Sequence, residues 1–456
     1  MGGWIKAGKE LSGSIRGLTI AGLLLALTGC SGGGLSGLSM PDVSSLNPFS
    51  EKEVPLPGKR VSVMTKTDSV TDNIAAASAP VSLPPQRPNQ SWTQPGGVPS
   101  NAPGHLLLAG TGKKVWSSSA GEGSSSDGKL TASPIALSGR IFTLDAEGNV
   151  TAFSASTGAR AWRTSLTPGG EDADEGYGGG IAADNGRLYV ATGFGTLVAL
   201  DPQSGNVLWQ KSLETPIRSS PTAAKGKVFV VTTEGRFYCL SGEDGTELWR
   251  YRGLSERASL LSNTSPAVAG NTVVVPFPSG DVVAVDISTG QAQWRESVAR
   301  GRARSSSLAS LNDSARPVID SGVVYAVGHS GRMIATEQKT GKRLWSQSVG
   351  GTQQPWVAGQ SVYVVDKGGR LMALSRKTGQ VLWVAKLPGG KTWSGPVLAG
   401  GQLWLASSKG TLISVDGKTG VVAKSRDLGD PVYISPIVAD GRMYVLTDNA
   451  DLMALN

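Results

Sequence analysis

Thr157-Gly-Ala-Arg-Ala-Trp162 is one copy of a motif that recurs along this chain: a small polar residue, glycine, three variable positions and tryptophan. In an eighth copy, which begins at Thr419-Gly420, Lys424 replaces the tryptophan. The tryptophans are roughly 40 to 50 residues apart, a period typical of four-stranded propeller blades and of solenoids. The chain is therefore a repeat protein. The motif tryptophans are Trp116, Trp162, Trp209, Trp249, Trp294, Trp345 and Trp383.

Short β-rich runs fill the stretches between the motifs. In the second unit, residues 187–191 and 196–200 are two such runs, separated by a glycine turn. Strands of about five residues with glycine turns, and no sustained helical period, exclude the helical solenoids. The sequence thus predicts an all-β fold, an eight-bladed β-propeller of four-stranded antiparallel blades. The motif tryptophans are expected to fill the wedges between neighbouring blades.

The order of the repeats indicates how the ring closes. Each unit opens with a segment that usually contains proline. Proline suits the start of the first strand of a blade, because it has no backbone N–H to donate to a neighbouring strand. The motif that ends at Trp116 comes before the first of these opening segments, whereas the last opening segment, at Pro436, has no motif after it. We therefore expect residues 106–117 to supply the outer strand of the last blade, so that the ring hides its sheet edges.

The first 29 residues have the features of a signal peptide. Three basic residues precede an apolar run over residues 18–27, which is about half of what a bilayer span needs. The run ends in Leu27-Thr-Gly-Cys30, which resembles a bacterial lipobox. We predict Cys30 as the lipidated N-terminus, and Ser31 favours sorting to the outer membrane. The alternative is a signal anchor with an incidental cysteine.

Residues 30–103 are rich in Gly, Ser, Pro and Asn and are expected to form a flexible tether between the lipid and a propeller at 104–456. One exception is the stretch 90–94, whose tryptophan is a candidate to pack on the ring. The formal charge of +8 is modest for this length. The sequence shows no nucleic-acid-binding motif and has an export signal, so we expect no nucleic-acid partner. Anionic headgroups or an acidic protein surface fit the positive charge better.

Residues for catalysis or metal binding are sparse. The chain has two histidines, His105 and His329, in unrelated contexts, and Cys239 is expected to be a small buried apolar residue. The acidic run 171–175 lacks the turn glycine and ligand spacing of a calcium loop. We predict neither catalysis nor a metal or other cofactor.

Together, the lipobox, the tether and the glycine-tryptophan blades resemble the BamB family, lipoproteins of the outer-membrane β-barrel assembly machinery, in the form seen in alphaproteobacteria. The blade motif is shared with other proteins built from PQQ-type repeats. The resemblance implies a scaffold without enzymatic activity on the periplasmic face of the outer membrane. Such a scaffold binds the periplasmic POTRA domains of a BamA-type barrel, works with the other subunits of the complex, and supports outer-membrane protein folding and insertion.

The resemblance also places partner contacts in two neighbouring interblade loops, residues 254–266 and 311–317. Counted back from the closing proline, Leu261 stands where the family has an arginine, and Asn312 takes an acidic position with Asp313 beside it. These loops belong to long connections, and long loops on a rigid ring are where binding usually resides. The candidate partner-binding residues are Arg257, Leu260, Leu261, Asn312, Asp313 and Arg316.

Two other functions remain open from the sequence. A quinoprotein dehydrogenase would use such blades to hold pyrroloquinoline quinone over calcium, but it typically has adjacent cysteines and a cluster of carboxylates, and neither is recognisable here. A propeller that binds another envelope partner is the third interpretation, because one fold supports many functions.

Overall fold

The computed structural model describes residues 81–110, 112–254, 264–299, 314–389 and 392–456. The predicted signal peptide, the lipidation site Cys30 and residues 30–80 of the predicted tether lie outside these ranges. No helix in the described ranges has the length and apolar character needed to cross a membrane. Their one short helix is a 3₁₀ turn, η3 (Ala173–Gly176), in the connection between the first two blades.

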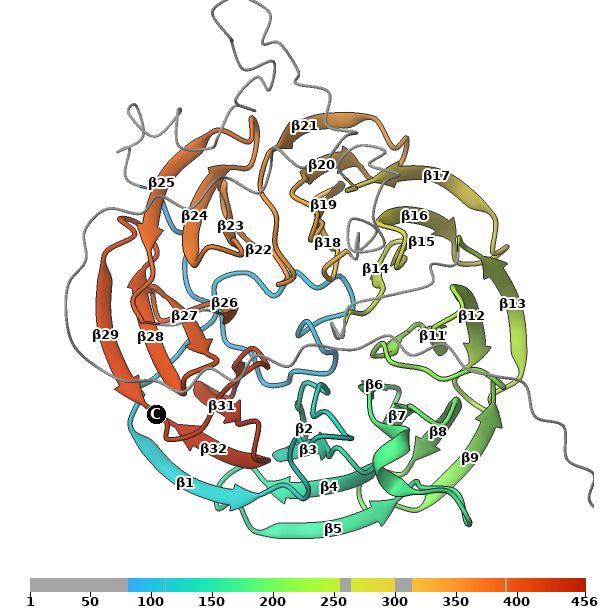
Figure 1. The fold of residues 1–456 in the computed structure, drawn as a ribbon. Coiled ribbons are helices and arrows are strands. Elements are labelled where there is room, and N and C mark those ends of the chain that lie inside the picture. Colours follow the sequence, from blue (N-terminus) through green and yellow to red (C-terminus); the bar gives the residue numbers. More distant parts are fainter. Residues whose placement is uncertain (1–80, 111, 255–263, 300–313, 390–391) are drawn as a thin grey trace, which may run out of the picture. The chain divides into compact units, whose positions relative to one another are not determined.

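Eight antiparallel four-stranded sheets are arranged as the blades of a propeller, which confirms the predicted fold class (Figure 1). Along the chain, blades 1 to 7 each run from the inner strand to the outer strand. The strands are, for blade 1, β2 (Ile135–Leu137), β3 (Arg140–Leu144), β4 (Asn149–Ser154) and β5 (Arg160–Ser165); for blade 2, β6 (Gly179–Asp184), β7 (Arg187–Thr192), β8 (Thr196–Leu200) and β9 (Val207–Ser212); for blade 3, β10 (Thr222–Ala224), β11 (Lys227–Val231), β12 (Arg236–Ser241) and β13 (Glu247–Arg252); for blade 4, β14 (Ala267–Ala269), β15 (Thr272–Pro276), β16 (Asp281–Asp286) and β17 (Ala292–Ser297); for blade 5, β18 (Val318–Asp320), β19 (Val323–Val327), β20 (Met333–Glu337) and β21 (Arg343–Gln347); for blade 6, β22 (Trp356–Ala358), β23 (Ser361–Val365), β24 (Arg370–Ser375) and β25 (Val381–Lys386); for blade 7, β26 (Trp393–Ala399), β27 (Gln402–Ser407), β28 (Thr411–Asp416) and β29 (Val422–Asp427); and for blade 8, β30 (Ile437–Ala439), β31 (Arg442–Leu446), β32 (Asp451–Leu455) and β1 (Lys114–Ser119).

Blade 8 is closed by the start of the propeller sequence, as predicted. Strand β1 pairs antiparallel with β32, with Lys114 opposite Leu455 and Ser119 opposite Asp451. The strand begins later than expected, because the backbone of Leu106 is hydrogen-bonded to Leu398 of blade 7 instead. Pairing the first and the last strand of the propeller in one sheet gives blade 8 its four strands.

The motif tryptophans fill the junctions between blades, which confirms their predicted role. At the junction of blades 2 and 3, a Cβ atom on Gly245 would lie 2.7 Å from the ring of Trp209. The indole of Trp209 also donates a hydrogen bond to the carbonyl of Gly242 at 3.2 Å. Only glycine allows this approach, and its φ of +73° adds a second reason for glycine. The other glycines that face a preceding tryptophan in this way are Gly158, Gly205, Gly290, Gly341, Gly379 and Gly420.

The junction of blades 7 and 8 is built differently, because Lys424 stands where the tryptophan would be. Here Trp404, from the second strand of blade 7, lies 3.4 Å from the position of a Cβ atom on Gly112. A cavity of about 420 Å³ remains beside it, lined in part by Lys424 and Arg426. Trp404 thus supplies an aromatic contact that the motif alone did not predict.

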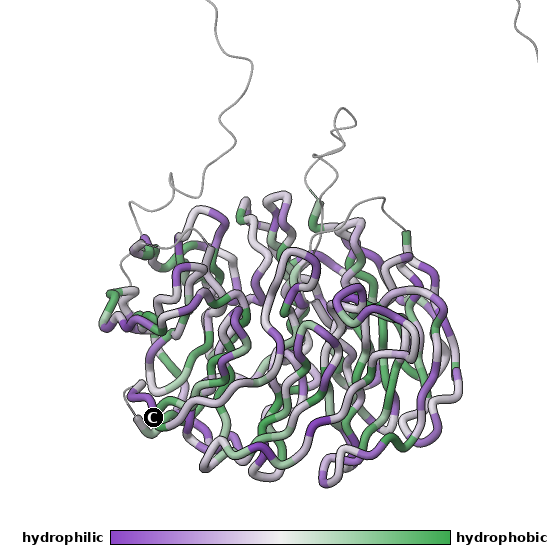
Figure 2. Tube along the Cα trace, turned by 60° about the horizontal axis from the view of Figure 1, so that its bottom comes forward, coloured by the Kyte–Doolittle hydropathy of each residue, from purple (hydrophilic) through white to green (hydrophobic). Residues whose placement is uncertain are grey.

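The core lies inside and between the blades. Figure 2 shows hydrophobic stretches along the strands and hydrophilic stretches at many of the turns. Cys239 is completely buried, as expected, among the apolar residues of blades 3 and 4. Burial raises the pKa of its thiol to about 12, so it is protonated at neutral pH.

The N-terminal side of the propeller differs from the sequence-based prediction. The sequence predicts a flexible tether up to residue 103, but in the structure residues 81–103 pack on the ring, with Val81, Trp92, Gln94 and Asn101 buried. In Figure 1 this blue segment crosses the centre of the ring. Residues 89–106, the central segment, hydrogen-bond to the innermost strand of every blade or to a residue directly beside it.

The contacts of the central segment follow one another around the ring. Trp92 exchanges two backbone hydrogen bonds with Ala136 of blade 1, and the carbonyl of Thr93 accepts from Ala183 of blade 2. The Gln94 side chain bonds to blades 2 and 3. The carbonyls of Pro99 and Ser100 accept hydrogen bonds from the backbone N–H groups of Val268 (blade 4) and Ile319 (blade 5). The carbonyl of Gly104 accepts one from the indole of Trp356 (blade 6). Leu106 bonds to Leu398 in β26 (blade 7), and Asn89 bonds to Val438 and Asp440 (blade 8). This stretch of polar composition is therefore ordered by hydrogen bonds to backbone groups on the edges of the inner strands. Amino-acid composition does not predict such bonds, because every residue type carries a backbone.

Candidate functional site

Two long connections join neighbouring blades on one side of the ring. One runs from β13 to β14 and the other from β17 to β18, and both lead from an outer strand to the next inner strand. Arg257, Leu260, Leu261, Asn312 and Asp313 lie in these connections, outside the described residues. At the described start of the first connection, Leu254 is 55% exposed.

The described ends of the two connections meet in the channel of the ring. Thr264 precedes β14, Ala315 and Arg316 precede β18, and all three line the same cavity. The cavity has a volume of about 270 Å³. The structure therefore brings together the bases of the two loops that the sequence singled out.

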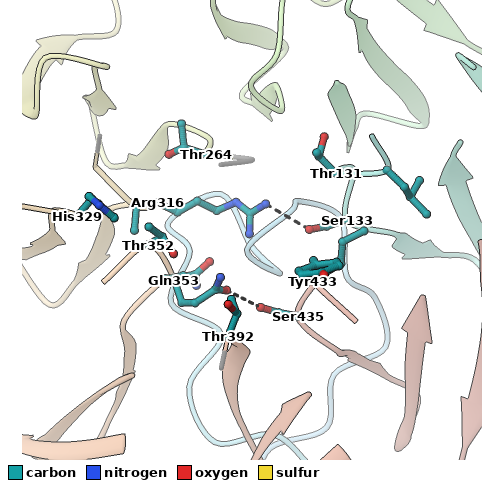
Figure 3. Close-up of a pocket in the computed structure, with 14 residues that line it drawn as sticks. Thr131, Ser133, Thr264, Arg316, His329, Thr352, Gln353, Thr392, Tyr433 and Ser435 are labelled. Atoms are coloured by element: carbon teal, nitrogen blue, oxygen red, sulfur yellow. Dashed lines mark hydrogen bonds between the residues drawn. The ribbon is translucent and has the colours of Figure 1, made fainter. Parts of the chain in front are cut away.

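Arg316 was expected at the partner surface, but its side chain points into this cavity and is only 9% exposed (Figure 3). Its Nη2 atom donates a hydrogen bond to the hydroxyl of Ser133, from blade 1, at 3.2 Å. Burial lowers the pKa of the guanidinium to about 10, which still leaves it charged at neutral pH. The reason for its position is local: Arg316 directly precedes Pro317, which leads into an inner strand, and that places it beside the channel.

The remaining lining of the cavity is polar and mostly neutral. Hydroxyl and amide groups come from the segments that precede the inner strands of several blades, and the side chains of Ser435 and Gln353 meet at 3.5 Å. Burial, reinforced by Lys367, lowers the pKa of His329, so this ring is neutral at pH 7. The cavity therefore presents several hydrogen-bonding groups beside the Arg316 guanidinium, which is itself hydrogen-bonded.

The described channel does not fit a calcium-bound quinone. Calcium takes six to eight oxygen ligands, usually with carboxylates among them. None of the described residues that line the cavity around Arg316 is Asp or Glu. Asp366 lies in an adjoining cavity of about 240 Å³, where it is paired with Arg370 at 2.6 Å. Across the described ranges, no group of three or more His, Cys, Asp or Glu is placed to hold a metal ion.

The other histidine has a structural role that the sequence did not reveal. His105 is buried, with Nδ1 2.7 Å from the carbonyl of Pro84, and Nε2 accepts a hydrogen bond from the backbone N–H of Gly401 at 2.9 Å. Its two ring nitrogens thus join the N-terminal segment to blade 7. The acidic run overlaps the turn η3, and Asp174 and Glu175 lie in the first turn of that helix.

A family model described as "Outer membrane protein assembly factor BamB" matches residues 105–174, 146–385 and 378–456, which together span the propeller. This chain belongs to the BamB family. The BamB of Yersinia pestis is 29% identical over 242 residues, which cover 52% of this chain and 61% of that protein. The BamB of Shewanella oneidensis is 26% identical over 337 residues, which cover 72% of this chain and 85% of that one. The chain thus spans less than two thirds of the Yersinia relative.

Solved structures support the same fold. BamB from Moraxella catarrhalis has a TM-score of 0.65 at 20% identity, covering 76% of this chain and 100% of that one. A quinohemoprotein alcohol dehydrogenase from Comamonas testosteroni has a TM-score of 0.63 at 14% identity, covering 80% of each chain. At these identities the likeness concerns the fold, so membership of the BamB family rests on the family model.

Proposed function

We propose that this protein is an assembly factor for outer-membrane proteins, a scaffold that has no enzymatic activity and needs no cofactor. The observation that carries the proposal is the family match, which extends over all eight blades. The channel lining adds support, because the described residues do not offer the carboxylate ligands that a calcium-dependent quinoprotein would need.

The proposal includes the location of the protein. Residues 1–29 act as a lipoprotein signal peptide, Cys30 carries the lipid, and residues 30–80 connect it to the described part of the chain, which begins at Val81. The propeller is then held on the periplasmic face of the outer membrane. A tether of about 50 residues reaches at most roughly 170 Å when fully extended, which is ample to present the ring to a membrane-embedded partner.

The partner is proposed to be the POTRA region of a BamA-type barrel, within a complex that contains further subunits. The contact surface comprises Leu260 and Leu261 with Arg257 on one loop, and Asn312 and Asp313 on the next. Two features support it: these loops join consecutive blades, and the connection carrying the leucine pair begins with the exposed Leu254. Arg316, at the described end of the second connection, lines the channel cavity.

Affinity purification of the lipidated protein from its own envelope, followed by mass spectrometry, tests the proposal. Leu260→Asp, Leu261→Asp and Asp313→Arg should each reduce recovery of the barrel-assembly subunits. The matched control is Leu208→Asp, because Leu208 is 48% exposed on the outer strand of blade 2, a blade that neither connection joins. That variant should retain the partner. Recovery of no assembly subunit with the parent protein, or of a different envelope partner alone, would contradict the proposed function.

A further inference from the structure

The junction of blades 7 and 8 has a cavity where the other seven junctions have an indole. At the neighbouring junction of blades 6 and 7, Trp383 is 5% exposed and its ring lies 2.6 Å from the position of a Cβ atom on Gly420. The corresponding position of blade 7 is Lys424, whose narrow side chain leaves a cavity of about 420 Å³. This volume is in the range of pockets that bind small ligands.

Three cationic side chains line this junction cavity. Lys113 comes from the residues just before β1, and Lys424 and Arg426 are two residues apart on β29, so they share one face of that strand. The described residues that line the cavity include no Asp or Glu. Within the described part of the chain, none of the three cations forms an ion pair. Their charges are therefore not balanced by neighbouring carboxylates.

The polar groups next to these cations have other partners or are neutral. Asp427 follows Arg426 on the opposite face of β29, and its carboxylate accepts a backbone hydrogen bond from two residues further on, at 2.9 Å. The main-chain oxygen of Asn456 accepts from the backbone N–H of Lys113 at 2.6 Å. The guanidinium of Arg426 donates to the carbonyl of Gly112, a neutral acceptor that holds the arginine across the junction.

The inner wall of the junction cavity is apolar. Trp404 and Leu412 line it and are only 5% and 1% exposed. The indole N–H of Trp404 already donates to the carbonyl of Ala399 at 3.1 Å, so the ring presents carbon atoms to the cavity. An apolar wall lowers the local dielectric constant and strengthens the attraction between the cations and an anion beside them.

The junction cavity is open to solvent. Lys113, Lys424 and Arg426 are all exposed. Figure 1 shows β29 and β1 next to each other on the circumference of the ring, across from β13 and β17, where the two long connections begin. A ligand can therefore enter from outside the ring, far from the channel and from the loops.

The number of cations indicates the kind of anion that would fit. A phosphate group carries roughly one to two negative charges and offers several acceptor oxygens, which can bind a guanidinium fork and two ammonium groups together. A single carboxylate has one charge and two oxygens, so it would leave part of this positive charge unmatched.

We propose that the junction cavity is a binding site for a phosphate group, carried by a soluble phosphate ester or by the headgroup of an anionic phospholipid. This site is distinct from the loop surface of the proposed function, and neither proposal requires the other.

Isothermal titration calorimetry on the full mature protein in detergent tests the site. The two probes are glycerol 3-phosphate and dihexanoyl-phosphatidylglycerol, and the controls that lack phosphate are glycerol and dihexanoylglycerol. We expect saturable binding of at least one phosphate probe, with its control at least tenfold weaker. Binding should weaken as the salt concentration is raised, because the cations are exposed. Binding of the first probe alone identifies a site for soluble esters, and binding of the second alone identifies a headgroup site.

Variants then assign the binding to this cavity. Lys424→Trp restores the motif and fills the cavity, so it should weaken binding at least tenfold while the thermal midpoint stays at or above that of the parent. Lys424→Met keeps the cavity open without the charge and should weaken binding about fivefold. Lys211→Met is the matched control, because Lys211 is exposed two residues after Trp209, the place that Arg426 has in blade 7. Its affinity should stay within about twofold of the parent.

Four results would overturn the proposal. They are that neither phosphate probe binds at about 10 mM, that the probes bind no better than the controls without phosphate, that folded Lys424→Trp and Lys424→Met bind like the parent, or that Lys211→Met loses as much affinity as Lys424→Met. If Lys424→Trp does not fold, Lys424→Met and Lys211→Met still decide the assignment.

Discussion

Gln94 tests whether the central segment holds the ring together. Its side chain is 1% exposed, and Nε2 donates hydrogen bonds to the carbonyls of Ala183 and Ala223 at 2.9 and 2.8 Å. Its Oε1 accepts from the backbone N–H of Ala223 at 3.0 Å. One buried amide thus joins the inner strands of blades 2 and 3.

Gln94→Ala removes three hydrogen bonds and leaves two carbonyls and one N–H on the inner strands without these partners. A buried backbone group that loses its partner costs about 1 to 3 kcal/mol. Because water entering the vacated space offsets part of this cost, we expect a loss of about 3 kcal/mol in the free energy of unfolding. Gln94→Glu keeps the size but replaces the donor with an oxygen that faces two carbonyls. It should therefore destabilise at least as much.

Denaturant unfolding followed by tryptophan fluorescence measures these differences. Gln203→Ala, at an exposed turn, is the matched control and should change stability by less than about 0.5 kcal/mol. A Gln94→Ala variant as stable as this control would refute the role of the central segment. If Gln94→Glu were much milder than Gln94→Ala, packing rather than hydrogen bonding would be the source of the effect.

Three further predictions concern the ring. Gly245→Ala should destabilise the protein by about 2 kcal/mol more than Gly186→Ala in denaturant unfolding. Both glycines have φ of +73°, but of the two only Gly245 faces a tryptophan ring, that of Trp209. Equal losses in the free energy of unfolding would contradict the wedge contact. Deletion of residues 114–119 should lower the thermal midpoint and promote association through the bared edge of β32, and an unchanged midpoint with a monomeric product would argue against ring closure by β1. The Cys239 thiol should react with iodoacetamide at pH 8 only in denaturant, and ready labelling of the native protein would contradict its burial. Because folding raises the pKa of this thiol from an ordinary 9.0 to about 12, the unfolded thiol ionises first, and the free energy of unfolding should fall as the pH increases above 9.

The propeller was predictable because its repeated contacts leave a repeated sequence pattern. A slot glycine such as Gly245 must accept the indole of the preceding blade, so glycine and tryptophan recur at fixed spacing. The offset between openings and motifs likewise predicted the pairing of β1 with β32. These features depend on side chains whose identity is constrained by close packing.

The central segment and the channel cavity were harder to predict, for two physical reasons. Residues 89–106 bind mainly through backbone groups, which any sequence carries, and the lone tryptophan at position 92 was the one signal of packing. Trp404 fills the eighth junction from another strand, so no motif position marks it. Arg316 was assigned to a surface loop by resemblance, although its place directly before Pro317 was a signal for the channel.

The most direct test of the proposed function is a binding measurement between the purified lipidated protein and the intact BamA-type barrel of the same organism, both in detergent. The proposal predicts saturable binding that weakens at least tenfold in a variant combining Leu260→Asp, Leu261→Asp and Asp313→Arg, and that is unchanged in Leu208→Asp. Absence of binding by the parent protein at micromolar concentrations, while both proteins are folded, would contradict it.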